Sequence, residues 1–145
     1  MQNVMVATDG SAGAGRAIDV AAQLAKAANA ALSIVTVGRA LSAEEQRQYR
    51  QFARIEGDSA DAAQALAQQI LFEAENRART AGIAPAKTIL VWGDPAHTLI
   101  ETIAHDKPDA IVVGRRGHGP LASLLLGSVS QKLASLAPCV VIVAP

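Results

Sequence analysis

An α/β fold, with a parallel sheet between two layers of helices, is the architecture that this sequence predicts. Short apolar runs rich in β-branched residues alternate with segments whose apolar residues recur at helical spacing. Several of the runs are almost continuously apolar, which is typical of parallel strands covered on both faces. Strands that alternate with helices pair in parallel through right-handed crossovers. The chain has 145 residues, 50% of them hydrophobic, and this size predicts a single domain over residues 1–145.

Five runs are expected to form the strands. Each is short, and the first, fourth and fifth have the most continuous apolar character, as expected for strands that are buried on both sides. The runs are Val4–Thr8, Leu32–Val37, Lys87–Trp92, Ala110–Gly114 and Cys139–Ala144.

The helices expected between these strands have recognisable starts and stops. The helix expected over Ala12–Ala30 has its apolar residues on one face, and either Ser11 or Asp9 can cap its first turn. Two further helices are expected, one from the N-cap Asp94 and Pro95 to about His105, and one over Ser128–Leu136 that ends near Pro138.

The stretch between residues 40 and 80 is expected to be helical in two pieces. Ser42 and Glu45 have the spacing of a capping box, which starts the first piece. The residues EGDSAD interrupt the helical pattern, and Asp58 can cap the second piece. The first piece is polar, so it either lies over the mouth of a site or simply faces water. Exposure to water is the simpler expectation.

Composition excludes several classes of function. The formal net charge is zero, and only 3% of the residues are aromatic, which argues against a protein that tracks a nucleic-acid backbone or stacks on its bases. The single cysteine, Cys139, cannot form an internal disulfide and is expected to be a buried thiol. No secretory signal is apparent, and no apolar run approaches the ~18 residues that span a bilayer. A cytoplasmic protein without membrane association is expected.

The stretch VVGRRGHGPLASLLLGS, Val112–Ser128, is the most unusual part of the sequence, with four of the eleven glycines. Gly114 and Gly117 let backbone amides turn toward an anion without interference from a Cβ atom. Nine residues later, Gly127 and Ser128 open the last expected helix, where free amides and two hydroxyls would favour a phosphate group. A mobile loop before a capped helix is the alternative, but it does not explain the upstream glycines.

The common nucleotide-binding and hydrolytic motifs do not fit this chain. Residues 117–122 read G-x-G-x-x-A, but the dinucleotide fingerprint belongs on the first strand–helix turn, with an acidic residue after the second strand. The Walker pattern G-x-x-x-x-G-K-[ST] and the pattern G-x-S-x-G are both absent. NAD(P) and FAD are therefore not expected.

The spacing G-x2-G-x9-G-S resembles the ATP-binding signature of the universal stress protein family. Three segments resemble the family in the same order, so that the resemblance covers nearly the whole chain except residues 40–80: VATDGSAGAGRAIDVAAQLA, GDPAHTLIETIAHDKPDAIVVGRRGHG and LLLGSVSQKLASLAPCVVIV. The family implies a Rossmann-like open α/β sheet of five parallel strands in the order 3-2-1-4-5. It also implies a homodimer joined through the last strand, whose apolar edge invites pairing with its own copy.

The resemblance further implies an ATP site with Mg²⁺ or Mn²⁺ beside the phosphates. Asp9 is the polar contact near adenine or ribose, Val37 flanks the base, and the scarcity of aromatics fits an aliphatic slot. At Arg115 relatives often have a small polar residue, and this arginine either strengthens phosphate binding or points to solvent. The implied contacts are Ala7, Thr8, Asp9 and Val37 for adenosine, Val113 and Gly114 for ribose, and Arg116, Gly117, Gly127, Ser128, Val129 and Ser130 for the phosphates.

Single residues in this set have competing interpretations. Arg116 is either a bidentate phosphate clamp or a solvated loop arginine, and the clamp is favoured. His118 has no carboxylate beside it in sequence, so a packing or solvent role is favoured over that of a general base. Asp9 is equally suited to ligand contact and to capping, and the two roles are compatible. His97 and His105 lack metal-ligand spacing and are expected to be structural.

These observations favour an ATP-binding regulator or sensor in stress response over a rapid enzyme. The sequence supplies groups that grip a triphosphate, but none that is obviously placed to activate water. One alternative is a slow ATPase or phosphotransfer enzyme that uses Asp9 or His118. The other is an interaction module that binds no nucleotide.

Overall fold

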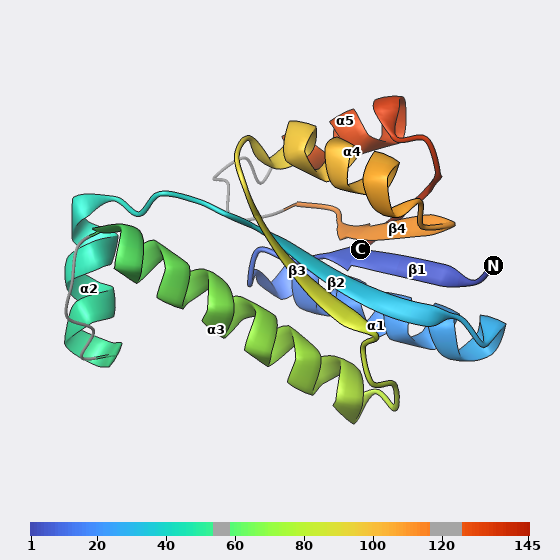
Figure 1. Cartoon of the computed structure of the whole chain (residues 1–145), viewed down its shortest axis with the longest axis horizontal. Helices are drawn as coiled ribbons and strands as arrows, with labels where there is room; N and C mark the ends of the chain where they lie inside the picture. The colour runs from blue at the N-terminus through green and yellow to red at the C-terminus, as the bar shows by residue number, and fades with distance from the viewer. Residues whose placement is uncertain (54–58, 117–125) are drawn as a thin grey trace.

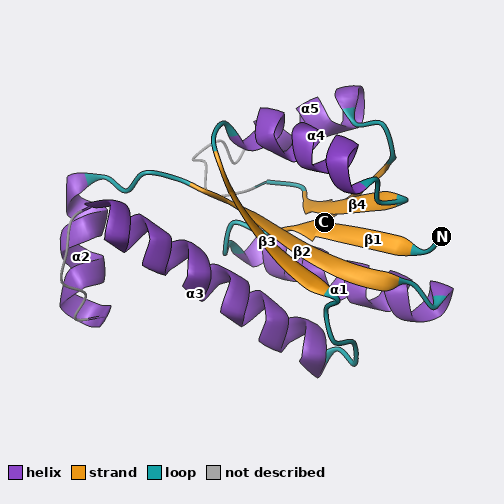
Figure 2. Cartoon of the chain, viewed as in Figure 1, coloured by secondary structure: helices purple, strands orange, loops and turns teal. Residues whose placement is uncertain are grey.

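The structure, a computed structural model, describes residues 1–53, 59–116 and 126–145, and it is built on one parallel sheet of five strands. The strand order is β3-β2-β1-β4-β5, with helices on both faces (Figure 2). This is the fold class and the order that the sequence and its resemblance predict. The strands are β1 (Asn3–Ala7), β2 (Ala31–Gly38), β3 (Lys87–Trp92), β4 (Ala110–Gly114) and β5 (Val140–Ala144).

The helices form two layers, and the chain runs from one to the other as it winds (Figure 1). One layer covers the sheet with α1 and α3, and the other with α4 and α5, while α2 lies beside one end of α3. The helices are α1 (Ala12–Ala28), α2 (Ala43–Ala53), α3 (Ser59–Thr80), α4 (Pro95–Asp106) and α5 (Ser128–Leu136).

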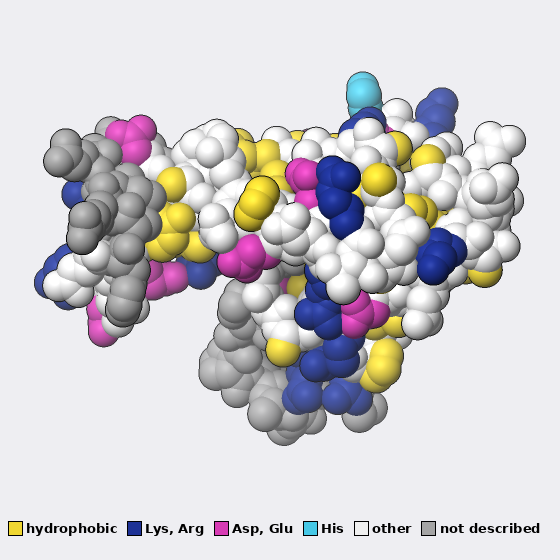
Figure 3. Space-filling view, turned by 90° about the horizontal axis from the view of Figure 1, so that it is seen from below, with side chains coloured by type: hydrophobic (Ala, Val, Ile, Leu, Met, Phe, Trp, Pro, Cys, Tyr) yellow, Lys and Arg dark blue, Asp and Glu magenta, His cyan; other side chains and the backbone are white. Residues whose placement is uncertain are grey.

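One apolar core lies on each face of the sheet, so that its central strands are buried on both sides. The core under α1 and α3 depends on small side chains: Ala17, Ala21 and Ala25 are completely buried, so that α1 packs closely against the strands. The core under α4 and α5 contains Leu99 and Leu133. The outer side of the α1 and α3 layer carries charges of both signs between small apolar patches (Figure 3).

Caps explain where the helices begin and end. The Ser11 side chain accepts a hydrogen bond from the Ala14 amide at 3.2 Å, and Asp94 accepts one from the His97 amide at 3.0 Å. The predicted helix over Ala12–Ala30 stops at Ala28 because Asn29 adopts a left-handed conformation with φ 52°. The second helical piece begins at Ser59, and its predicted cap, Asp58, lies outside the described residues.

The polar helix α2 has its own small contact with α3. Leu41 just before α2 is buried together with Ala62 and Ala63 of α3, and Tyr49 packs against them. The capping box at its start forms as predicted, since the Ser42 hydroxyl accepts from the Glu45 amide at 3.2 Å and Glu45 accepts from the Ser42 amide at 3.2 Å. No helix in the described part of the chain is long and apolar enough to cross a membrane.

Candidate functional site

The strand order reverses between β1 and β4, and the two connections diverge there. The chain leaves β1 into α1 on one face and leaves β4 toward α5 on the other. A crevice is expected beyond the carboxyl ends of two such strands, because neither connection covers it. This topology places the turn 8–11 and the glycines 114 and 127 around one opening.

A cavity of about 420 Å³ lies at this position, within the size range of small-molecule sites. The twelfth predicted ATP contact, Gly117, lies outside the described residues, as does His118. The other eleven all line the cavity: Ala7, Thr8, Asp9, Val37, Val113, Gly114, Arg116, Gly127, Ser128, Val129 and Ser130.

One end of the cavity is apolar. It is formed by side chains from β1, β2, β4 and α4, without an aromatic ring among the lining residues. Val35 and Val37 are alternate residues of β2 and therefore point to the same side of the strand. Leu99 of α4 is buried next to them. Aliphatic side chains such as these suit an apolar group of a ligand.

The turn after β1 gives this end its polar groups. The Asp9 carboxylate accepts a hydrogen bond from the Ser11 amide at 2.9 Å, while Ser11 itself caps α1. The capping role that the sequence divided between these two residues therefore belongs to Ser11. Asp9 holds the turn and at the same time lines the cavity. Thr8 is fixed by its carbonyl, which accepts from the Thr36 hydroxyl at 2.6 Å.

The other end of the cavity is the first turn of α5. The cap residue Gly127 offers no side-chain hydrogen bond, and among the described residues no acceptor faces the amides of Ser128, Val129 and Ser130. Three free N–H groups together with the positive end of the helix dipole attract an anion.

Two details of the predicted phosphate site are wrong. The Gly127 amide is not free, because it donates to the Arg115 carbonyl at 2.7 Å. The Ser130 hydroxyl is also engaged: it donates to the carbonyls of Arg115 at 3.0 Å and Gly127 at 3.1 Å. These bonds fasten the start of α5 to the end of β4, so that the donors left for a ligand are the next three amides and the Ser128 hydroxyl.

The two glycines that line the cavity differ in whether the surrounding structure leaves room for a side chain. A Cβ atom on Gly114 would lie 2.8 Å from the Gly13 carbonyl carbon, so β4 and α1 approach too closely for any side chain. Among the described residues, the nearest atoms to a Cβ atom on Gly127 would lie 3.4 Å away, and its φ of −73° suits any residue. Neither its backbone conformation nor its described neighbours therefore require glycine at position 127.

The two adjacent arginines after β4 differ in position. Arg116 lines the cavity, as the clamp interpretation requires. Arg115 is exposed and is not a lining residue; its amide donates to the Ala144 carbonyl at 2.9 Å. Of the two alternatives for Arg115, its side chain points to solvent, and its backbone organises the site.

The histidines and the cysteine do not form a second site in the described structure. His97 and His105 are exposed and pair with Glu101 and Asp106, both at 2.7 Å or less. Burial raises the pKa of the Cys139 thiol, which is half-buried. Among the described residues no group of three or more His, Cys, Asp or Glu is placed to hold a metal ion.

Seven lining residues were not predicted from the sequence, and Arg39 is the only charged one. Val35, Val37 and Arg39 alternate along β2 and past its end, so strand periodicity alone could have placed Arg39 on the cavity side. The others come from helix starts and the β2 interior: Ser11, Ala14, Val35, Pro95, Leu99 and Gln131.

Comparisons with known proteins show the family and agree with the fold. The sequence model of the Universal stress protein family matches residues 1–145. Universal stress protein YxiE of Bacillus subtilis (strain 168) is 34% identical over 153 residues, which cover 97% of this chain and 96% of that protein. The crystal structure of a universal stress protein in complex with cAMP has a TM-score of 0.69 and 33% identity, and covers 99% of this chain and 96% of that one. The universal stress protein UspA from Lactobacillus plantarum has the same fold, with a TM-score of 0.75 at 24% identity over 99% of this chain and 97% of that one.

Proposed function

Because this chain belongs to the universal stress protein family, we propose that it binds ATP in the cavity between β1 and β4. In this proposal the base lies in the apolar end and the phosphates lie at the start of α5. The protein then acts as a nucleotide-dependent regulator or sensor in a stress response.

The observation that carries the proposal is the group of three amides at Ser128, Val129 and Ser130. They face a cavity of about 420 Å³ and have no partner among the described residues. Buried or half-buried N–H groups normally have acceptors, so a helix start that opens on a cavity is suited to phosphate oxygens. Arg116, which also lines the cavity, is suited to a bidentate contact with the same phosphate group.

The apolar end supports a nucleotide rather than an inorganic anion. A solved relative that is 33% identical is in complex with cAMP, whose adenosine part is common to ATP. In this chain Val35 and Val37 are suited to enclose the base, and Asp9 is suited to accept from its amino group or from a ribose hydroxyl.

Mg²⁺ or Mn²⁺ is proposed as the counter-ion of the phosphates. Among the described residues, no cluster of carboxylates could surround a metal ion. This suits an ion that is held mainly by the nucleotide and by water, with the Ser128 hydroxyl or Asp9 beside it. Bound there, the ion would neutralise phosphate charge.

Regulation is favoured over rapid catalysis. Among the described residues that line the cavity, Asp9 is the only carboxylate, and it already holds the turn before α1. A slow ATPase or phosphotransfer enzyme that uses Asp9 or His118 is the second candidate, and turnover above about 1 s⁻¹ would favour it.

We also propose that the protein is cytoplasmic and that the chain forms a single domain. Two copies of it would form a dimer through β5. This strand is at the sheet edge, and Val140 at its start is 55% exposed. An apolar edge with unpaired backbone groups is suited to pair with a second copy.

Calorimetric titration of the purified chain with ATP and Mg²⁺ tests the proposal. We expect saturable binding. No heat of binding at millimolar ATP would contradict it, and would favour an interaction module that takes no nucleotide.

A further inference from the structure

Arg39 is a charged residue at the apolar end of the cavity, and neither the motif nor the family resemblance assigns it a role. It follows the last residue of β2, two positions after Val37 and four after Val35. All three line the cavity, because alternate residues of an extended chain point to the same side. The row of apolar side chains therefore ends in a guanidinium group.

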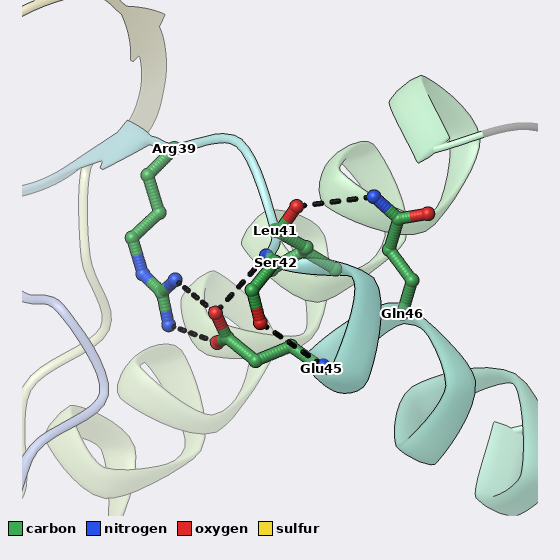
Figure 4. A network of polar contacts seen from close by, with 5 residues as sticks. All are labelled: Arg39, Leu41, Ser42, Glu45 and Gln46. Carbon is green, nitrogen blue, oxygen red and sulfur yellow. Dashed lines mark hydrogen bonds and ion pairs between the residues drawn. The ribbon is translucent and has the colours of Figure 1, made fainter.

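The capping box of α2 holds this guanidinium in place (Figure 4). Glu45 accepts two hydrogen bonds from Arg39, at 3.2 Å from Nη1 and 2.8 Å from Nη2. The same carboxylate accepts from the Ser42 amide at 3.2 Å. Because both partners are fixed, Arg39 loses less freedom when it makes a further contact than a mobile surface arginine would.

Arg39 keeps donors for a ligand in this arrangement. A guanidinium has five N–H groups, and Glu45 takes two of them. The hydrogen bonds that Arg39 donates to Glu45 and the nearby charges of Glu45 and Asp9 raise the pKa of Arg39, so that the group stays charged. Half of the side chain, 51%, is exposed, so the remaining donors are accessible.

The place of Arg39 decides which part of a nucleotide it reaches. The proposed phosphate donors are at the start of α5, beyond β4, whereas Arg39 follows β2 on the other side of β1. A base that lies along Val35 and Val37 has its far edge toward Arg39. Purines present an acceptor on that edge, N1 in adenine and O6 in guanine, and the single ring of a pyrimidine is shorter.

We propose that Arg39 donates a hydrogen bond to the far edge of a bound purine and makes the cavity prefer purine over pyrimidine nucleotides. This inference rests on the proposed nucleotide-binding function. It adds a specificity-determining residue outside the glycine motif, and it gives the capping box at the start of α2 a part in positioning that residue.

The test compares the affinities of ATP, AMP and CTP in four chains: the natural one, Arg39→Ala, Glu45→Ala and Arg79→Ala. Arg79 is a matched control, because it is 55% exposed and pairs with Glu75 on the outer helix α3. Circular dichroism verifies that each variant is folded.

In the natural chain we expect ATP and AMP to bind more tightly than CTP. Arg39→Ala should weaken ATP and AMP by the same factor of about ten, the size of a hydrogen bond to a charged group, and leave CTP unchanged. Glu45→Ala keeps the guanidinium and should retain most of the preference for purines. Arg79→Ala should have no effect.

Several results would overturn the inference while the proposed function stands. One is equal affinity for ATP and CTP in the natural chain, and another is an unchanged ratio of ATP affinity to CTP affinity in Arg39→Ala. A third is that Arg39→Ala weakens the binding of ATP but not of AMP. The last is that Glu45→Ala weakens nucleotide binding as much as Arg39→Ala does. Absence of any nucleotide binding by the natural chain would overturn both the inference and the proposed function.

Discussion

The Ser130 hydroxyl donates a hydrogen bond to the carbonyl of Arg115 over 3.0 Å, and so fastens the first turn of α5 to the end of β4. The Gly127 amide donates to the same carbonyl at 2.7 Å. Together these bonds determine where the amides of Ser128, Val129 and Ser130 lie relative to the sheet. The end of the cavity where we propose that the phosphates bind is therefore held in place by hydrogen bonds within the chain itself.

Ser130→Ala should lower the free energy of unfolding by about 0.5–1.5 kcal/mol, because a buried hydroxyl loses its hydrogen bonds. The loss stays modest because both carbonyls keep amide partners, Gly127 and Gln131. Urea denaturation measures it. Ser128→Ala is the control, since the Ser128 side chain is exposed. Equal losses of stability in both variants would show that the hydrogen bonds of the Ser130 hydroxyl do not stabilise the fold.

Gly114→Ala should destabilise the fold by about 1–3 kcal/mol, the usual cost of overpacking. Its Cβ atom would come within 2.9 Å of the Gly13 carbonyl oxygen, and backbone cannot move aside as a side chain can. Gly127→Ala should change stability little, because its Cβ atom meets nothing closer than 3.4 Å. Thermal denaturation of the two variants compares their stabilities. Similar losses of stability in Gly114→Ala and Gly127→Ala would contradict the close approach of β4 and α1.

Gly127→Val should fold normally and lose ATP binding. Its backbone conformation suits any residue, but the two γ-carbons extend toward the cavity that Gly127 lines. Calorimetry with ATP and Mg²⁺ measures the loss, with Gly127→Ala as the milder step. Unchanged ATP affinity in the valine variant would place the phosphates elsewhere.

Glu45 should titrate far below an ordinary glutamate. Hydrogen bonds from Arg39, and then from Ser42, lower its pKa from 4.5 to about 2. Since the folded-state pKa is the lower one, the stabilisation is complete above the ordinary value and is lost as pH falls toward the folded value. Carbon-detected NMR of the carboxyl group follows the titration.

Removal of the arginine tests the cause of that shift. Arg39→Ala should move the Glu45 midpoint back toward 4.5, whereas Arg79→Ala should leave it in place. A midpoint near the ordinary value in the natural chain would mean that the pair does not persist in solution.

The proposed dimer can be tested at the outward-facing backbone of β5. The Val140 amide donates to Asp109 at the β4 side, so the next amide along the strand, that of Val141, points to the open edge. Val141→Pro removes this outward donor and should yield a folded monomer. Light scattering at micromolar concentration should report a dimer for the natural chain. A monomer there would contradict pairing through β5.

Local patterns predicted most of the fold. Apolar runs located the strands to within one residue at most ends, and Ser42, Glu45 and Asp94 marked helix starts that the structure confirms. The end of α1 was predicted two residues late, because an asparagine in a left-handed cap does not interrupt the apolar pattern.

Long-range hydrogen bonds explain what sequence reasoning missed in the site. The bond between Gly127 and Arg115 spans a loop, so no local pattern indicates that this amide is engaged. Arg39 was missed because its partner, Glu45, belongs to a helix for which exposure to water was the simpler of two expectations. No residue of α2 lines the cavity in the described structure, but Glu45 of α2 forms an ion pair with Arg39, which does line it.

Amide NMR of the natural chain tests the central claim most directly, by comparing titrations with ATP and Mg²⁺ and with adenosine. ATP should shift the amide signals of Ser128, Val129 and Ser130 strongly, because phosphate oxygens accept from them. Adenosine should shift signals at Ala7 and Val37 and leave those three nearly unmoved. If the three amides do not respond at saturating ATP, the start of α5 does not hold the phosphates.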